Sequence, residues 1–185
     1  MADRAPWNQP WPWTPADLEG ALAELAQRAP FLPGRTVRPG AIPWPADAPG
    51  GSHSPDLSEE RAWLKSPAYL AGWRCYDAGR FWEAHEAWED CWHAARQANL
   101  DQQAARLRAL IQLAACGLKL RLGQTRAART LWQRAERNAA QASDQHTMGV
   151  DLAKHLEAWR RILDTESPDW RARRRFKTAR SQSTE

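Results

Sequence analysis

His85 and Glu89 are the two residues whose types and spacing best suit binding chemistry. They lie four residues apart in the run 81–95, where apolar residues recur at helical intervals. Residues at i and i+4 share one face of a helix, so the imidazole and the carboxylate can contact each other or hold a third group between them. Such a pair can bind a divalent cation or join a hydrogen-bond network inside the protein.

Aromatic residues surround this pair in the sequence. One broad stripe of the helical wheel holds Phe81, Ala84, His85, Trp88, Cys91, Trp92 and Ala95. We therefore expect His85 to face inward and Glu89 to project from the edge of the stripe, sheltered by tryptophans. Glu83, Glu86 and Asp90 lie on the opposite side of the wheel.

His93 does not extend the pair into a two-histidine metal site. Eight residues of helix separate it from His85, a rise of about 12 Å, which is too far for both imidazoles to reach one ion. The run H-E-A-W-E also differs from the H-E-x-x-H motif of zinc proteases, because Glu89 replaces the second histidine. A metal site here needs ligands from other elements, and the candidates are His53, Glu59, Glu60, Asp77, His146 and His155.

Gln112 is the one strongly polar residue in the run 109–118, which is otherwise apolar on all sides. A helix of this composition lies at the centre of a bundle. A buried amide needs hydrogen-bond partners, and His85 and Glu89 would supply a donor and an acceptor. Two interpretations stay open: an internal network that fixes how two helices pack, or a ligand or metal site built on the same residues. We favour the network, because the sequence shows no third metal ligand.

Helical signals run through most of the chain after residue 57. We expect helices over 17–28, 58–76 with an interruption at Ser66-Pro67, 81–97, 101–122, 125–142 and 150–163. No alternation of β-branched residues predicts a strand. The short connections at 77–80 and 123–124 require antiparallel neighbours. The predicted fold is therefore all-α, a bundle of stacked helical hairpins whose packing resembles that of tetratricopeptide repeats.

Composition divides the chain into three parts. Residues 1–56 form a Pro/Trp-rich arm with one short helix, 57–165 the helical core domain, and 166–185 a basic tail. Tryptophans of the arm are expected to pack back onto the body; they are Trp7, Trp11, Trp13 and Trp44. No apolar stretch is long enough to cross a membrane, and the N-terminus lacks the layout of a signal peptide, so we expect a soluble, cytoplasmic protein. Its three cysteines, Cys75, Cys91 and Cys116, are expected to be reduced thiols.

Basic residues concentrate in the C-terminal half. Residues 1–100 carry a net charge of −4 and residues 101–185 a net charge of +8. Eight basic residues lie between positions 106 and 137, namely Arg106, Arg108, Lys119, Arg121, Arg126, Arg129, Arg134 and Arg137. Such a face can neutralise phosphates, so weak, non-specific binding of nucleic acid is one expectation. The competing expectation is a solvated surface that pairs partly with the acidic residues of 83–90.

The run G-R-F-W-E-A-H-E-A-W-E-D-C-W over 79–92, followed by L-I-Q-L-A-A over 110–115, resembles a bacterial and archaeal family catalogued as domain of unknown function 309. The resemblance covers residues 68–138. The family's signature, H-x-x-x-E-x-x-W, is carried by His85, Glu89 and Trp92. The resemblance implies a small all-helical cytoplasmic domain and a possible divalent-metal site at His85 and Glu89.

The sequence therefore predicts a small cytoplasmic binding or structural module whose polar centre is His85, Glu89 and Gln112. The residues of this centre or beside it are His85, Glu86, Trp88, Glu89, Trp92 and Gln112. Two alternatives stay open: a divalent-metal-binding protein or metal-dependent hydrolase using His85 and Glu89, and a nucleic-acid-associated protein using the basic half. No Gly-rich phosphate loop or nucleophile elbow supports a conventional enzyme class. Oligomeric state is left open.

Overall fold

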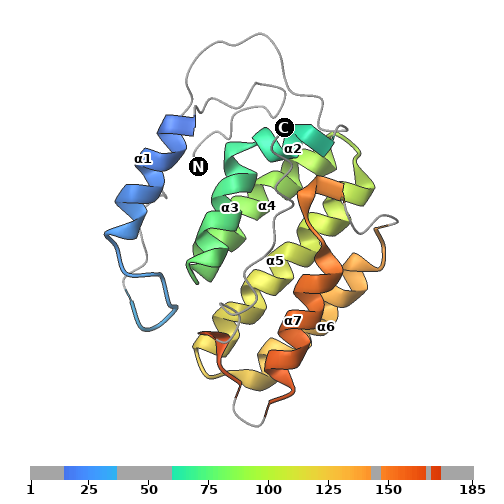
Figure 1. Ribbon diagram of the computed structural model, residues 1–185. Helices are drawn as coiled ribbons and strands as arrows, with labels where there is room; N and C mark the ends of the chain where they lie inside the picture. The colour runs from blue at the N-terminus through green and yellow to red at the C-terminus, as the bar shows by residue number, and fades with distance from the viewer. Residues whose placement is uncertain (1–14, 37–59, 143–146, 166–167, 172–185) are drawn as a thin grey trace.

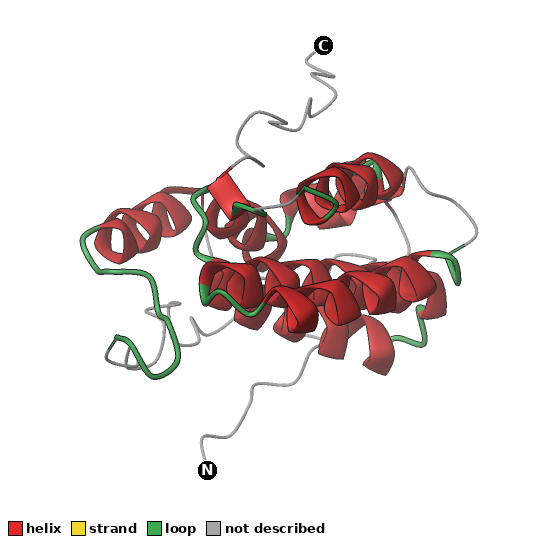
Figure 2. Cartoon of the chain, turned by 90° about the horizontal axis from the view of Figure 1, so that it is seen from below, coloured by secondary structure: helices red, strands yellow, loops and turns green. Residues whose placement is uncertain are grey.

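The computed structural model describes residues 15–36, 60–142, 147–165 and 168–171. Every regular element among these residues is helical (Figures 1 and 2). The elements are α1 (Pro15–Ala26), α2 (Glu60–Lys65), α3 (Pro67–Asp77), α4 (Phe81–Gln97), α5 (Asp101–Arg121), α6 (Thr125–Ala139), the 3₁₀ turn η1 (Thr147–Gly149) and α7 (Leu152–Leu163). The all-α bundle predicted from the sequence is confirmed.

The same kind of turn joins α3 to α4, α4 to α5 and α5 to α6. A residue with positive φ follows each helix: Gly79 at 73°, Asn99 at 56° and Gly123 at 77°. The next amide then donates back five residues, as in the bond of 2.8 Å from Arg80 N to Cys75 O. These are Schellman caps, which satisfy the last helical carbonyls and reverse the chain within a few residues. Successive helices are therefore antiparallel neighbours (Figure 1).

Helix α5 packs against α4 on one side and α6 on the other, and α7 covers α6 (Figure 1). Aromatic side chains fill the space between α3, α4 and α7, where Trp63, Tyr69, Tyr76, Phe81, Trp88 and Trp159 are at most 1% exposed. The buried Tyr76 hydroxyl accepts a hydrogen bond from the indole nitrogen of Trp159, which ties α3 to α7. The three cysteines are free thiols inside this core.

The ends of the expected helices shift by a few residues. Helix α4 spans the predicted 81–97, whereas α6 ends at Ala139 and α7 begins at Leu152. Met148 adopts a positive φ of 61°, and the Asp151 carboxylate caps α7 by accepting a hydrogen bond from Lys154 N at 3.0 Å. A left-handed residue followed by an N-cap fixes the start of the last helix two residues later than the apolar pattern indicates.

Helix α1 lies at one edge of the molecule in both views (Figures 1 and 2) and packs against α3. Its Leu25 is 2% exposed and belongs to the core. The four arm tryptophans named above lie outside the described residues, so their packing stays a prediction, as does the division of the chain into three parts. From the C-terminal segment, Trp170 packs edge-on against Phe81 with ring centroids 5.8 Å apart. No helix among the described residues is long and apolar enough to cross a membrane.

Candidate metal centre on helix α4

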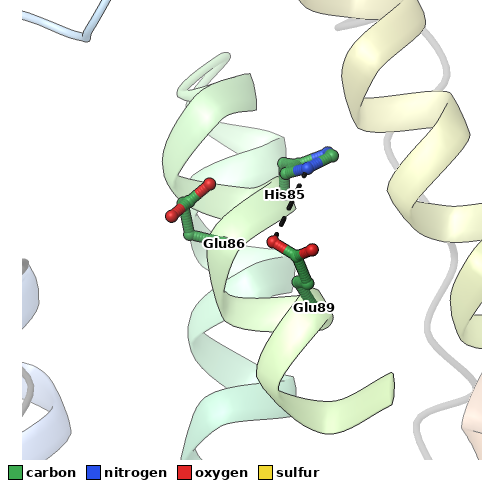
Figure 3. Close-up of side chains that lie close together, drawn as sticks. All are labelled: His85, Glu86 and Glu89. Atoms are coloured by element: carbon green, nitrogen blue, oxygen red, sulfur yellow. Dashed lines mark ion pairs between the residues drawn. The ribbon is translucent and has the colours of Figure 1, made fainter. Parts of the chain in front are cut away.

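His85 and Glu89 lie side by side on one flank of α4 (Figure 3). Their closest atoms, His85 Nε2 and Glu89 Oε2, are 4.0 Å apart, which is an ion-pair distance for a protonated imidazole but too long for a hydrogen bond. The side chains are 28% and 44% exposed. The pair is thus reachable from solvent rather than sealed between helices as the network interpretation requires.

Glu86 adds a second carboxylate to this group. One ligand atom from each of His85, Glu86 and Glu89 lies within 4.8 Å of the others, and all three side chains are half-buried. On an ideal helix they occupy an arc of about 100°, with Glu89 between the other two in angle and one turn further along. The wheel places Glu86 away from the apolar stripe, and its carboxylate extends on the other side of α4 from His85 (Figure 3), with one oxygen still within the 4.8 Å limit of the group.

The candidate for a third ligand is thus a residue of α4 itself. Among the other candidates named from the sequence, Asp77 and His155 belong to the described part of the chain but not to this group. His155 is 6% exposed and packs against the ring of Trp73 at 5.0 Å between centroids. His53, Glu59, Glu60 and His146 carry no described side chain.

One imidazole nitrogen and two carboxylate oxygens are a ligand set that suits Zn²⁺ and neighbouring divalent ions. Ligand atoms around a tetrahedral Zn²⁺ with bonds of about 2.1 Å lie about 3.4 Å apart. The observed limit of 4.8 Å therefore has to close by rotation of the side chains. Both carboxylates are part-exposed, so the surrounding protein leaves room for this rotation. The remaining coordination positions would face solvent and accept water or an anionic ligand.

The three tryptophans of α4 differ in how they relate to this group. The Trp82 ring lies nearly parallel to the His85 ring, with centroids 6.2 Å and planes 18° apart. Trp88 is fully buried and donates from its indole nitrogen to Tyr69 O at 3.3 Å, so it belongs to the core rather than to the site. Trp92 is half-buried, and Arg108 lies over its ring at 5.1 Å. Its indole nitrogen is buried with no hydrogen-bond partner among the described residues.

The register between α4 and α5 follows from two contacts at different heights. Phe81 packs against Gly117 at one end, and Arg108 covers Trp92 at the other. Interpolating along two antiparallel helices places Gln112 at the level of residues 86–88. It also lies one turn from Arg108 on the same face of α5.

Gln112 therefore lies at about the same height along the α4–α5 pair as the His85 group, and no described contact joins it to His85 or Glu89. Its Oε1 atom is buried and has no hydrogen-bond partner within the part of the chain that the structure describes. The hydrogen bond that the sequence led us to expect from His85 to this oxygen is not formed in this conformation. The amide oxygen instead remains a buried acceptor without a partner among the described residues.

Burial makes the three thiols poor nucleophiles and poor metal ligands. Desolvation raises the pKa of Cys75 to about 12, with a smaller contribution from nearby Glu83, and raises the pKa of Cys116 to about 12. Burial raises the pKa of Cys91 as well. A thiol with so high a pKa carries almost no thiolate near neutral pH. The expectation of inert, reduced cysteines agrees with these surroundings.

Two charged residues are buried, although the sequence pattern indicated that they would be exposed. Arg106, counted above with the basic face, is 1% exposed and lies on the buried side of α5. Glu83, which the wheel sets opposite the apolar stripe, is also 1% exposed. Other basic residues hold the fold together: Arg121 donates to Gly79 O at 2.8 Å, and Arg129 pairs with Asp164 at 3.1 Å. The basic face is accordingly smaller than the sequence count indicates.

Comparison with known proteins points to the same region. Residues 69–131 match the model of a family described as Domain of unknown function (DUF309), a segment that runs from α3 into α6 and includes the whole His85 group. No curated protein and no solved structure matches the chain. The family resemblance read from the H-x-x-x-E-x-x-W signature is confirmed by this match. The protein is therefore a small helical module whose residues 69–131 are similar to the DUF309 family.

Proposed function

We propose that this DUF309 domain is a binding module for a divalent cation of the zinc type, held by His85, Glu86 and Glu89. The observation that carries the proposal is the convergence of one imidazole and two carboxylates within 4.8 Å on a part-exposed face of α4. His85 and Glu89 share one face of the helix at i and i+4, and Glu86, about 100° round the helix from His85, would complete the set by rotating its side chain towards them. Three ligands from one side would leave the other side of the ion open. An open site of this kind binds a further small ligand at the free coordination positions.

The alternative of a purely structural pair has weaker support. A cross-brace needs buried partners with short hydrogen bonds, because only a buried network contributes much to the free energy of unfolding. His85 and Glu89 are part-exposed, and 4.0 Å separates their closest atoms. An exposed ion pair of this geometry contributes about 1 kcal/mol or less.

Calorimetric titration of the tag-free protein with Zn²⁺ tests the proposal. We expect one ion per chain in the wild type, and a loss of affinity of at least about tenfold in each of His85→Ala, Glu86→Gln and Glu89→Gln, since even outer-shell partners are worth that much. Asp90→Asn is the matched control, because Asp90 is a half-buried carboxylate beside Glu89 that does not belong to the group. Equal losses in Asp90→Asn and Glu89→Gln would show that general negative charge, not this site, attracts the ion.

A further inference from the structure

Glu83 is a carboxylate buried on α4 two residues before His85. It is 1% exposed and forms an ion pair of 3.3 Å with Arg80, which is 8% exposed. Taking two charges out of water is costly unless the pair gains further hydrogen bonds. The helical wheel places Glu83 away from the apolar stripe of α4, so an element outside the α4–α5 hairpin has to cover it.

Residues 28–36, which we call the strap, provide this cover. The backbone amide of Phe31 donates to Glu83 Oε1 at 3.2 Å, and the Arg80 guanidinium donates to Arg28 O. Both members of the buried ion pair are thus hydrogen-bonded to main-chain groups of the strap. At its far end, Arg35 donates to Leu122 O at 3.3 Å. The strap is held by specific polar contacts as well as by apolar packing.

The strap also contacts the candidate metal centre through two aromatic rings. Phe31 is 9% exposed and packs edge-on against Trp82, with centroids 5.0 Å apart and planes at 74°. Trp82 in turn lies nearly parallel to the His85 imidazole at 6.2 Å. Phe31, Trp82 and His85 therefore form a continuous row of rings from the strap to the proposed ligand.

We propose that the strap sets the orientation of the His85 imidazole, with Glu83 and Arg80 as its anchor and Phe31 and Trp82 as the connecting rings. Phe31 fixes one edge of Trp82, and the fixed indole limits the rotamers open to His85. Without Phe31, the indole gains freedom and His85 spends less time in the binding orientation. Affinity for a cation then falls by the lost fraction of competent conformer. This inference rests on the proposed function for its effect on binding, but the ring orientation is testable without any metal.

The anchor is suited to reversible attachment. The second carboxylate oxygen of Glu83, Oε2, is buried and has no hydrogen-bond partner within the described residues. A buried acceptor left unsatisfied lowers the stability of the attached state. Release of the strap would return both oxygens to water, which partly offsets the loss of the Phe31 and Arg28 contacts.

Two measurements on the full chain test the strap. Limited trypsin digestion reports its release, because Arg28 and Arg35 lie within it, and NMR spectra of the imidazole carbons report the ring current of Trp82 on His85. We expect Phe31→Ala and Glu83→Gln to speed cleavage at these arginines and to move the His85 signals toward those of an exposed histidine. Phe31→Tyr keeps the ring and should leave both readouts as in the wild type. Ile162→Ala removes a residue of α7 that is 3% exposed, and should lower the melting temperature without moving the His85 signals.

The two proposals can fail separately. With Co²⁺ as the probe, Phe31→Ala should weaken binding by about threefold to tenfold, the range expected when the competent conformer becomes a minor one. If the wild type binds no Co²⁺, the metal proposal fails while the NMR shift of His85 in Phe31→Ala still supports the strap. Faster cleavage with unchanged His85 signals would overturn the coupling. Unchanged cleavage in both variants would overturn the anchor.

Discussion

The ring of Phe81 lies against the backbone of Gly117, at a point where an added Cβ would come within 2.7 Å of the ring. This contact joins the first turn of α4 to the last turns of α5 and sets their register. The same register brings Gln112 level with the His85 group. A glycine on α5 therefore helps to position side chains that lie more than a turn away.

Replacing Gly117 by Ala should destabilise the protein, since the new methyl group overlaps a fully buried ring. Overpacking of this kind costs about 1–3 kcal/mol. Gly20→Ala in α1 is the control, because its added Cβ would meet nothing within 4 Å. That change should be neutral or stabilising by up to about 1 kcal/mol. Urea unfolding of both variants gives the comparison, and equal stabilities would contradict the register described here.

Removing His85 should change stability very little in the absence of metal. The His85–Glu89 pair is part-exposed, so His85→Ala is expected to alter the free energy of unfolding by less than about 1 kcal/mol. Trp88 lies fully buried on the same helix and is the reference for a truly structural position. Trp88→Ala should cost about 3–5 kcal/mol in the same urea unfolding experiment. A loss of several kcal/mol in metal-free His85→Ala would restore the network interpretation.

Stability should fall in alkaline solution through the buried thiols. The folded-state pKa of Cys116 is raised by burial from 9.0 to about 12. Below pH 9 the Cys116 thiol is protonated in both the folded and the unfolded protein, and its contribution to the free energy of unfolding is complete. As the pH rises from about 9 to 12 this contribution is lost, because only the unfolded protein then releases the thiol proton. Each buried thiol makes the free energy of unfolding fall more steeply with pH, by up to about 1.4 kcal/mol per pH unit. Urea unfolding between about pH 8 and pH 11 measures this slope, and Cys116→Ala should make it shallower; an unchanged slope would refute the assignment.

Nucleic-acid binding through the remaining basic face should be weak and strongly dependent on salt. Arg126, Arg134 and Arg137 are exposed on α6, and none takes part in an ion pair among the described residues. Replacing all three by Gln should reduce the slope of log affinity against log salt by about 2–3. The matched control replaces three arginines that are already paired with carboxylates, namely Arg74, Arg96 and Arg161. Fluorescence anisotropy with a labelled duplex measures both; tight, sequence-selective binding at physiological salt would contradict the expectation.

The helices were predictable from the sequence because their ends carry local signals. Gly79 and Gly123 mark two of the three Schellman turns, whereas Asn99 takes the third without the glycine that usually announces it. The His85–Glu89 pair was equally visible, since i, i+4 spacing on a helix is a local property.

The burial of Glu83 and the position of Glu86 in the candidate site could not be predicted from the sequence. Glu83 is buried by the strap, 52 residues away, and a helical wheel takes no account of a separate segment. Candidates for a third ligand were sought on other elements, although Glu86 lies next to His85. An apolar stripe on a helical wheel predicts which residues enter the core. It does not predict which of the polar residues outside the stripe lie next to a candidate site.

The most direct test of the account follows the five histidines of the chain by NMR during a titration with Zn²⁺. Binding at the proposed centre predicts that the His85 signals change in proportion to added metal and stop changing at one equivalent. The signals of His155, which is buried among aromatic rings, should stay in place. Saturation at one equivalent with the His85 signals unmoved would contradict the account, as would an equal response of the His85 and His93 signals.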